Sequence, residues 1–334
     1  MRSKAIRVLL LLLASGPLSA SPLFESEAVL EVQIEGPFGR FIDERYDREE
    51  LPFVLRTDGE EYAVGLRSRG KSRMRACTFP PIRLDFDAAA VSGTLFEGQD
   101  KLKLVTHCLG GPSGQANVME EYSAYKVFNL LSDTSYRVRP LKVTYTDTDG
   151  EHEELVSNAF LLESDVELAA RVGGSVVQLA GVRKSMLNRD QAAIVYIFQY
   201  LIANTDWSLI ASAGEEYCCH NGGLVGRDGE LYYVPFDFDL SGLVDARYAK
   251  PDPSLRITKV TSRYYRGYCI EPESLAGALA SINAKQAEIL AVFDSIPGLG
   301  EKDANSAKRF LDRFFREAEN EKKLVTRFER SCVE

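Results

Sequence analysis

Residues 234–242 read VPFDFDLSG and place two acidic side chains, Asp237 and Asp239, inside an otherwise apolar segment. In extended backbone, side chains two positions apart point to the same side, so the pattern predicts two neighbouring carboxylates. Like charges this close repel one another unless a proton or a cation neutralises them. Mg²⁺ and Mn²⁺ prefer oxygen ligands, and the pair therefore indicates a site for one of these metals. A strand end with two solvated acids is the alternative.

A second cluster, NTDWS at residues 204–208, follows a mostly apolar segment at 190–203 that predicts a buried helix. Asp206 thus lies where a helix ends and a loop begins; a turn aspartate is the alternative. A helix, a loop aspartate, a hairpin and a strand ending in Asp-Phe-Asp is the order found in kinase-like phosphotransferases. In these enzymes one aspartate orients or deprotonates the acceptor hydroxyl, and a later one holds Mg²⁺ on the nucleotide phosphates. Asp206 is therefore the candidate catalytic residue.

The rest of the chain divides into a β-rich part and a helical part. Strand-like patterns occur at 29–34, 62–66, 82–86, 101–105, 138–145, 157–162 and 230–236, and helical patterns at 115–131, 272–293 and 303–330. A hairpin with Asp228-Gly229 at its turn is expected at 217–236. This order predicts an α+β, two-lobed, kinase-like fold. We expect a β-rich N-terminal lobe at 21–165 and a mainly helical C-terminal lobe, which carries the hairpin, at 166–334.

The first 20 residues resemble a secretory signal peptide. Arg2, Lys4 and Arg7 precede an apolar run at 8–13, and small residues end the segment at Ala20. The run is too short to cross about 30 Å of hydrocarbon. We expect cleavage before Ser21, a periplasmic or secreted protein, and no membrane span in the mature chain. The formal net charge of −9 argues against nonspecific binding of nucleic acid.

Six cysteines in an exported chain predict disulfides: Cys77, Cys108, Cys218, Cys219, Cys269 and Cys332. A zinc site is the alternative, although no CxxC pair is present. We expect at least two disulfides. Cys77–Cys108 is the favoured pair, because one cysteine precedes the strand at 82–86 and the other follows the strand at 101–105. Cys218 and Cys219 are each expected to reach a distant partner, since adjacent cysteines bridge poorly.

Five basic residues alternate along the chain at positions 67, 69, 71, 73 and 75. In a strand this spacing places all five on one face. A site for phosphate or an acidic polymer is one interpretation, and a solvated charged strand is the other.

Over roughly residues 60–245 the chain resembles the CotH-type secreted kinases. That family has an Arg-Gly element, a Phe-Pro element and a basic strand in this order, like RSRG at 67–70, Phe79-Pro80 and IRL at 82–84 here. A strand like 101–105 and a helix like 120–131 follow. The family then has an Asn-x-Asp loop and an aromatic-Asp-x-Asp strand end, which are similar to 204–206 and 236–239.

The resemblance implies an exported kinase-like protein that binds ATP with Mg²⁺ or Mn²⁺ and transfers phosphate to an unknown protein or small-molecule hydroxyl. Arg83 or Lys103 would contact phosphate, because Pro81 stands where the family has a lysine. Glu121 would pair with a basic residue, and Glu120 beside it is a second candidate. Asn221 would join the metal ligands Asp237 and Asp239, because the family's asparagine after the loop aspartate is missing.

Two rival functions remain open at this point. One is a noncatalytic cell-envelope protein that uses the same fold to bind a ligand or a partner. The other is a metal-dependent hydrolase that acts on phosphoesters.

Overall fold

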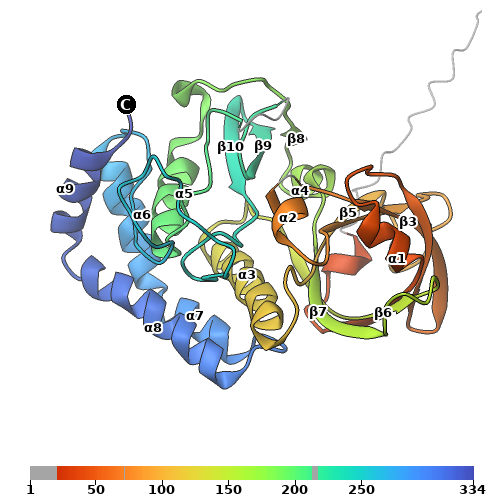
Figure 1. The fold of residues 1–334 in the computed structure, drawn as a ribbon. Coiled ribbons are helices and arrows are strands. Elements are labelled where there is room, and N and C mark those ends of the chain that lie inside the picture. The colour runs from red at the N-terminus through yellow and green to blue at the C-terminus, as the bar shows by residue number, and fades with distance from the viewer. Residues whose placement is uncertain (1–20, 71, 213–216) are drawn as a thin grey trace, which may run out of the picture.

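The computed structural model describes residues 21–70, 72–212 and 217–334. The expected signal peptide lies outside these residues, so its cleavage stays a prediction. Seven strands close into a barrel in the order β1-β2-β3-β4-β5-β7-β6. The barrel lies at the right of Figure 1. The strands are β1 (Leu30–Gly36), β2 (Leu51–Thr57), β3 (Glu60–Ser68), β4 (Ile82–Phe86), β5 (Lys101–Val105), β6 (Val138–Asp147) and β7 (Leu155–Leu162).

The barrel closes because β6 pairs in parallel with β1, while the other neighbouring strands pair antiparallel. The expectation of a two-lobed kinase-like fold is therefore wrong: the chain forms a closed, mixed β-barrel accompanied by helices. The alternation of apolar and polar residues along the strands explains why the barrel interior is apolar. In β2, for example, Leu51, Phe53 and Leu55 are buried, while the residues between them are more exposed.

The remaining elements pack around a second apolar core. They are the helices α3 (Pro112–Leu131), α4 (Asp165–Arg171), α5 (Arg189–Leu201), α6 (Pro272–Ala284), α7 (Gln286–Ala291), α8 (Glu301–Ala318) and α9 (Glu321–Ser331), and the strands β8 (Ser175–Val176), β9 (Gly222–Arg227) and β10 (Glu230–Pro235). Val118, Tyr122 and Phe128 of α3 belong to this core together with Phe198 of α5. Helix α3 thus joins the helices rather than the barrel interior (Figure 1).

Several element boundaries differ from the expectation. The segment at 272–293 breaks into α6, α7 and the 3₁₀ helix η3 (Val292–Asp294), and the last helix is interrupted at residues 319–320. The side chain of Asn320 caps α9 by accepting a hydrogen bond from the backbone of Lys323. The hairpin is confirmed, but β9 begins only at Gly222. Further short helices are η1 (Pro22–Phe24), α1 (Phe38–Asp43) and η2 (Lys184–Met186).

The alternating basic residues do not lie on one strand face, so that expectation is wrong. Strand β3 ends at Ser68, and Gly70 adopts a positive φ of 79°. Ser72–Ala76 then forms the short helix α2, which carries Arg73 and Arg75. Lys71 lies outside the described residues. The turn at Gly70 therefore separates residues that a strand would have aligned.

Three disulfides join the six cysteines. Cys77–Cys108 is confirmed, with Cα atoms 4.5 Å apart, and Cys269–Cys332 links the segment before α6 to the end of α9. Cys218 and Cys219 pair with each other, so the expectation of distant partners for them is wrong. Within the described ranges, the helices are all too short or too polar to cross a membrane.

Candidate functional site

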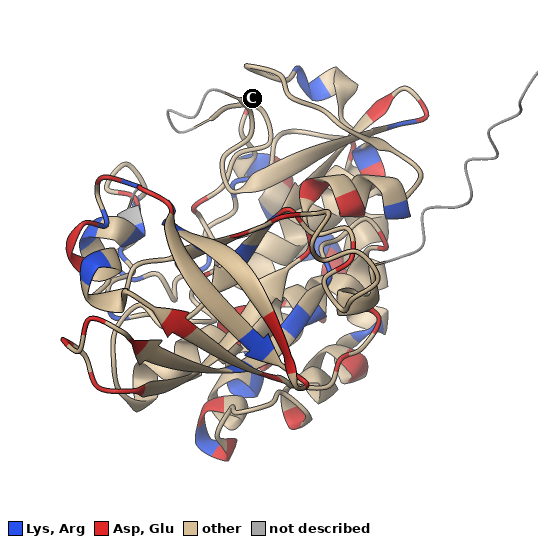
Figure 2. Cartoon of the chain, turned by 90° about the vertical axis from the view of Figure 1, so that its right-hand side faces the viewer, with Lys and Arg blue, Asp and Glu red and all other residues tan. Residues whose placement is uncertain are grey.

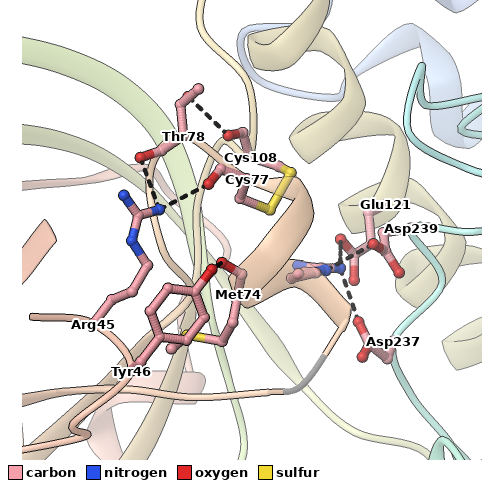
Figure 3. Close-up of a disulfide and its surroundings, with 10 residues drawn as sticks. Arg45, Tyr46, Met74, Cys77, Thr78, Cys108, Glu121, Asp237 and Asp239 are labelled. Atoms are coloured by element: carbon pink, nitrogen blue, oxygen red, sulfur yellow. Dashed lines mark hydrogen bonds and ion pairs between the residues drawn. A yellow bond between two sulfur atoms is a disulfide. The ribbon is translucent and has the colours of Figure 1, made fainter. Parts of the chain in front are cut away.

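Arg73 of α2 lies among three carboxylates that come from two other parts of the chain. Its Nε donates to Oδ2 of Asp239 at 2.7 Å, and its Nη2 donates to Oδ1 of Asp237 at 2.8 Å and to Oε2 of Glu121 at 3.0 Å. Figure 3 shows Glu121, on α3, close to Asp237 and Asp239, which follow β10. We call these four residues the Arg73 cluster.

The Arg73 cluster is poorly solvated. The side chains of Arg73 and Glu121 are only 9% and 3% exposed. Burial raises the pKa of Glu121 to about 7, with Arg73 opposing the shift and the neighbouring aspartates adding to it. Burial also raises the pKa of Asp239. Burial acts in the same direction on Asp237, but the positive charges of Arg73, Arg69 and Lys103 outweigh it and lower the pKa of that carboxyl.

The two aspartates do not lie on a straight continuation of strand β10. Strand β10 ends at Pro235, and Asp237 has a positive φ of 63°. The Asp237 amide donates to the hydroxyl of Tyr125 at 2.9 Å, which fixes the turn against α3. A left-handed conformation is uncommon for residues other than glycine and costs on the order of 1 kcal/mol or more. The surrounding contacts therefore hold both aspartates on the same guanidinium.

Two further cations lie close to Asp237. The Nζ atom of Lys103, on β5, lies 3.9 Å from the centroid of the Phe236 ring. Arg69 follows β3, and its Nε donates to the carbonyl of Ile82 at 3.2 Å. In the part of the chain that the structure describes, neither forms an ion pair within 4.0 Å, although the charge of Asp237 acts on both. Burial lowers the pKa of each.

Arg83, the other phosphate-contact candidate, is differently placed. It lies opposite Lys103 in the register of β4 and β5, but its Nη2 binds the carboxylate of Asp85 at 3.0 Å. A second carboxylate, from Glu50, lies 3.6 Å away. The Arg83 charge is thus already paired, whereas Lys103 has no carboxylate within 4.0 Å among the described residues.

Asp206 is held by two donors from the segment before β9. Oδ1 of Asp206 lies 2.8 Å from Nε2 of His220, and Nδ2 of Asn221 donates to Oδ2 at 2.9 Å. The Asp206 side chain nevertheless stays 38% exposed. The amide of Phe236 donates to the Asn221 carbonyl at 3.0 Å, which places this group next to the segment that carries Asp237.

The loop before Asp206 is also rigidly built. The Asn204 side chain accepts a hydrogen bond from the Asp206 amide at 3.0 Å, and the Asn204 backbone carbonyl accepts one from the indole of Trp207 at 3.0 Å. Ala203 and Asn221 both have positive φ angles, 52° and 51°. Together with Asp237, they are three left-handed residues next to the candidate residues. Such conformations concentrate at functional sites, where the surrounding structure determines them.

The three expected metal ligands lie near one another, but they do not fit a divalent cation as arranged. Arg73 binds one oxygen of Asp237 and one of Asp239, and Asn221 turns its amide nitrogen toward Asp206. Across residues 21–70, 72–212 and 217–334, no three His, Cys, Asp or Glu side chains are grouped so that they could hold a metal ion. A guanidinium therefore lies where the sequence predicted a metal.

Glu120 and Glu121 are neighbours in sequence but face different surroundings. Glu121 pairs with a basic residue as expected, although that residue lies on a helix and not on a strand. Glu120 accepts a hydrogen bond from Asn117 and lines a groove of about 630 Å³ beside α8, together with Asp245 and Asp303. That groove contains none of the candidate residues Asp206, Lys103 or Asp237, so it is separate from the Arg73 cluster.

Helix α2 is tied down at its C-terminal end. Cys77, directly after the helix, forms the disulfide to Cys108, and the Arg45 guanidinium donates to the Cys77 carbonyl at 2.9 Å. The Tyr46 hydroxyl donates to the Met74 carbonyl at 3.1 Å (Figure 3).

The cavity between Arg73, Glu121 and Tyr248 measures about 10 Å³. It has room for one water at most.

The role of Arg73 is the feature that sequence reasoning missed. Arg73 belongs to the alternating basic run, and that pattern reads as a strand rather than as a single buried cation. Arg69 was missed in the same way. The one available signal was the short distance in sequence between Arg73 and Cys77, because a disulfide restrains the residues next to it.

Neither a known protein-family model nor a curated protein sequence matches this chain. The resemblance to CotH-type kinases therefore stays a prediction that rests on the quoted residues.

Proposed function

We propose that the chain is an exported protein that binds ATP or a related phosphorylated ligand at Lys103 and Arg69. The three disulfides support export, because such bonds persist in oxidising compartments. The charges are consistent with a localised rather than an extended anion site. Figure 2 shows Lys and Arg interspersed with Asp and Glu over the face that it presents.

One observation carries the proposal: two partly buried cations, with no described carboxylate within 4.0 Å, lie beside the carboxylates that Arg73 binds. Burying a cation is costly unless an anion offsets its charge. A phosphate group supplies that charge and several hydrogen-bond acceptors. With Arg73 in place, the nearby aspartates repel such a ligand less than bare carboxylates would.

A phosphotransferase activity is the second candidate, and Asp206 favours it. Its carboxylate is oriented by His220 and Asn221, yet it remains exposed enough to accept a hydrogen bond from an acceptor hydroxyl. Positioning of this kind is a main part of catalysis in phosphoryl transfer. The acceptor would be a protein or a small-molecule hydroxyl.

Thermal unfolding in the presence of ATP, ADP and pyrophosphate tests the binding proposal. A ligand that binds only the folded chain stabilises it by about 2.7 kcal/mol at a hundredfold excess over Kd. No shift with any of the three compounds would refute the proposal.

Asp206→Asn separates binding from transfer. The variant should bind ATP like the wild type but lose transfer of labelled phosphate. If the wild type binds ATP without transferring or hydrolysing it, the noncatalytic binding function remains. Release of free phosphate without a labelled acceptor would instead favour a hydrolase.

A further inference from the structure

We propose that Arg73 is a built-in cation that replaces a divalent metal, so that the chain binds its phosphorylated ligand without Mg²⁺ or Mn²⁺. This inference rests on the proposed function for the identity of the ligand. It starts from the disagreement between the predicted metal ligands and the guanidinium that binds them.

The geometry of the Arg73 cluster matches the role of a neutralising cation. A guanidinium is planar and presents several N–H donors in a fixed fork, which suits carboxylates better than an ammonium does. Arg73 uses Nε for Asp239 and Nη2 for both Asp237 and Glu121, at 2.7 to 3.0 Å. One side chain thus joins all three carboxylates, and a metal would have to displace it from each.

Displacement is opposed by the position of α2. The Arg73 side chain is only 9% exposed. One helical turn further along the chain, Cys77 is fixed by its disulfide to Cys108. The backbone amide of Cys77 donates to the carbonyl of Arg73 at 2.9 Å. Tyr46 holds the Met74 carbonyl on the same helix. Because the helix cannot swing away without breaking these contacts, the guanidinium stays among the carboxylates.

The surrounding charges explain why a phosphorylated ligand needs no metal here. In a metal-dependent site, the cation screens phosphate from acidic ligands. Here Arg73 offsets one carboxylate charge, and Arg69 and Lys103 supply further positive charge on the side of Asp237. The metal's electrostatic role is therefore carried by three side chains.

Isothermal titration of the wild type with ATP, in excess EDTA and in Mg²⁺, tests the inference. The two Kd values should agree within about threefold, whereas ATP binding that is about tenfold or more tighter in Mg²⁺ would overturn it. Failure to bind ATP in either buffer would refute the proposed function, and the cation titration below would then decide the role of Arg73.

That second titration uses Mn²⁺ without nucleotide on the wild type, Arg73→Gln and the matched control Arg75→Gln, which changes an exposed arginine of the same helix. Arg73→Gln should bind Mn²⁺ at least about tenfold more tightly than the wild type, because it uncovers three carboxylates. Arg75→Gln should match the wild type. If Arg73→Gln does not fold, Arg73→Lys supplies the comparison, since one ammonium leaves part of the cluster uncovered. Wild-type Mn²⁺ binding as tight as that of the Arg73 variant would contradict the inference.

Discussion

Arg73 and Cys77 lie one helical turn apart, and the amide of Cys77 donates to the carbonyl of Arg73 at 2.9 Å. The residue that binds three carboxylates is therefore one turn away from a disulfide that ties the end of α2 to the segment after β5. Figure 3 shows the Cys77–Cys108 disulfide next to Met74 of α2. Residues 73–77 therefore connect the disulfide, which stabilises α2, to the arginine that binds the carboxylates.

Arg73→Gln should strongly destabilise the fold. Removing one partner of a buried ion pair leaves uncompensated charge and costs about 3–5 kcal/mol. Arg75→Gln, on the exposed side of the same helix, should change the free energy of unfolding by no more than about 0.5 kcal/mol. Urea denaturation of the three proteins measures the difference. Equal stability of the two variants would show that Arg73 contributes no net stabilisation.

Loss of the Cys77–Cys108 disulfide and loss of the Cys218–Cys219 disulfide should have unequal effects. The Cys77–Cys108 disulfide joins residues that are 31 positions apart in sequence. Replacing both cysteines by serine should lower the free energy of unfolding by about 3–4 kcal/mol, the chain entropy that this crosslink removes from the unfolded state. Replacing Cys218 and Cys219 should cost much less, because these residues are adjacent and close no long loop. Thermal unfolding of the two double variants under oxidising conditions makes the comparison. A larger loss from Cys218 and Cys219 would contradict this ranking.

Glu120→Gln should stabilise the protein at alkaline pH. Burial raises the pKa of Glu120 to about 7 from its usual value near 4.5. Between these two pH values the folded chain binds more protons than the unfolded chain, so the free energy of unfolding falls as the pH rises. The loss reaches about 3 kcal/mol above neutral pH, and glutamine avoids it while keeping an acceptor for Asn117.

The measurement is urea denaturation of the wild type and Glu120→Gln at about pH 5 and about pH 8. The exposed residue Glu288 provides the control variant Glu288→Gln, which should follow the wild type at both pH values. A stability difference between the wild type and Glu120→Gln that does not grow with pH would count against a buried, uncompensated carboxyl.

Local patterns predicted many elements but not the closure of the barrel. The strands at 82–86 and 101–105 alternate clearly, and because they are neighbours the Cys77–Cys108 pair could be predicted from them. The pairing of β1 with β6 joins Leu30 to Leu141, and no local signal marks a contact so distant in sequence. Without that pairing, the strands read as an open β-rich lobe.

The candidate site shows the same division. Asp237 and Asp239 could be recognised because acids stand out in an apolar segment, and Asp206 because it follows a buried helix. The cation that joins the carboxylates could not, because alternating charges at 67–75 fit a strand and only the turn at Gly70 sends Arg73 into α2. The different surroundings of Arg83, which pairs with Asp85, and Lys103, which lies over the Phe236 ring, also depend on tertiary contacts.

The most direct test of the proposed binding function is isothermal titration of ATP into the wild type, Lys103→Ala and Arg83→Ala. The two substituted residues lie opposite each other on adjacent strands, so the variants form a matched pair. We predict that Lys103→Ala weakens ATP binding by about tenfold or more, because an available, partly buried cation is lost. Arg83→Ala should change Kd by no more than about threefold, since Arg83 already pairs with Asp85. Equal ATP affinity in the wild type and Lys103→Ala would contradict the account.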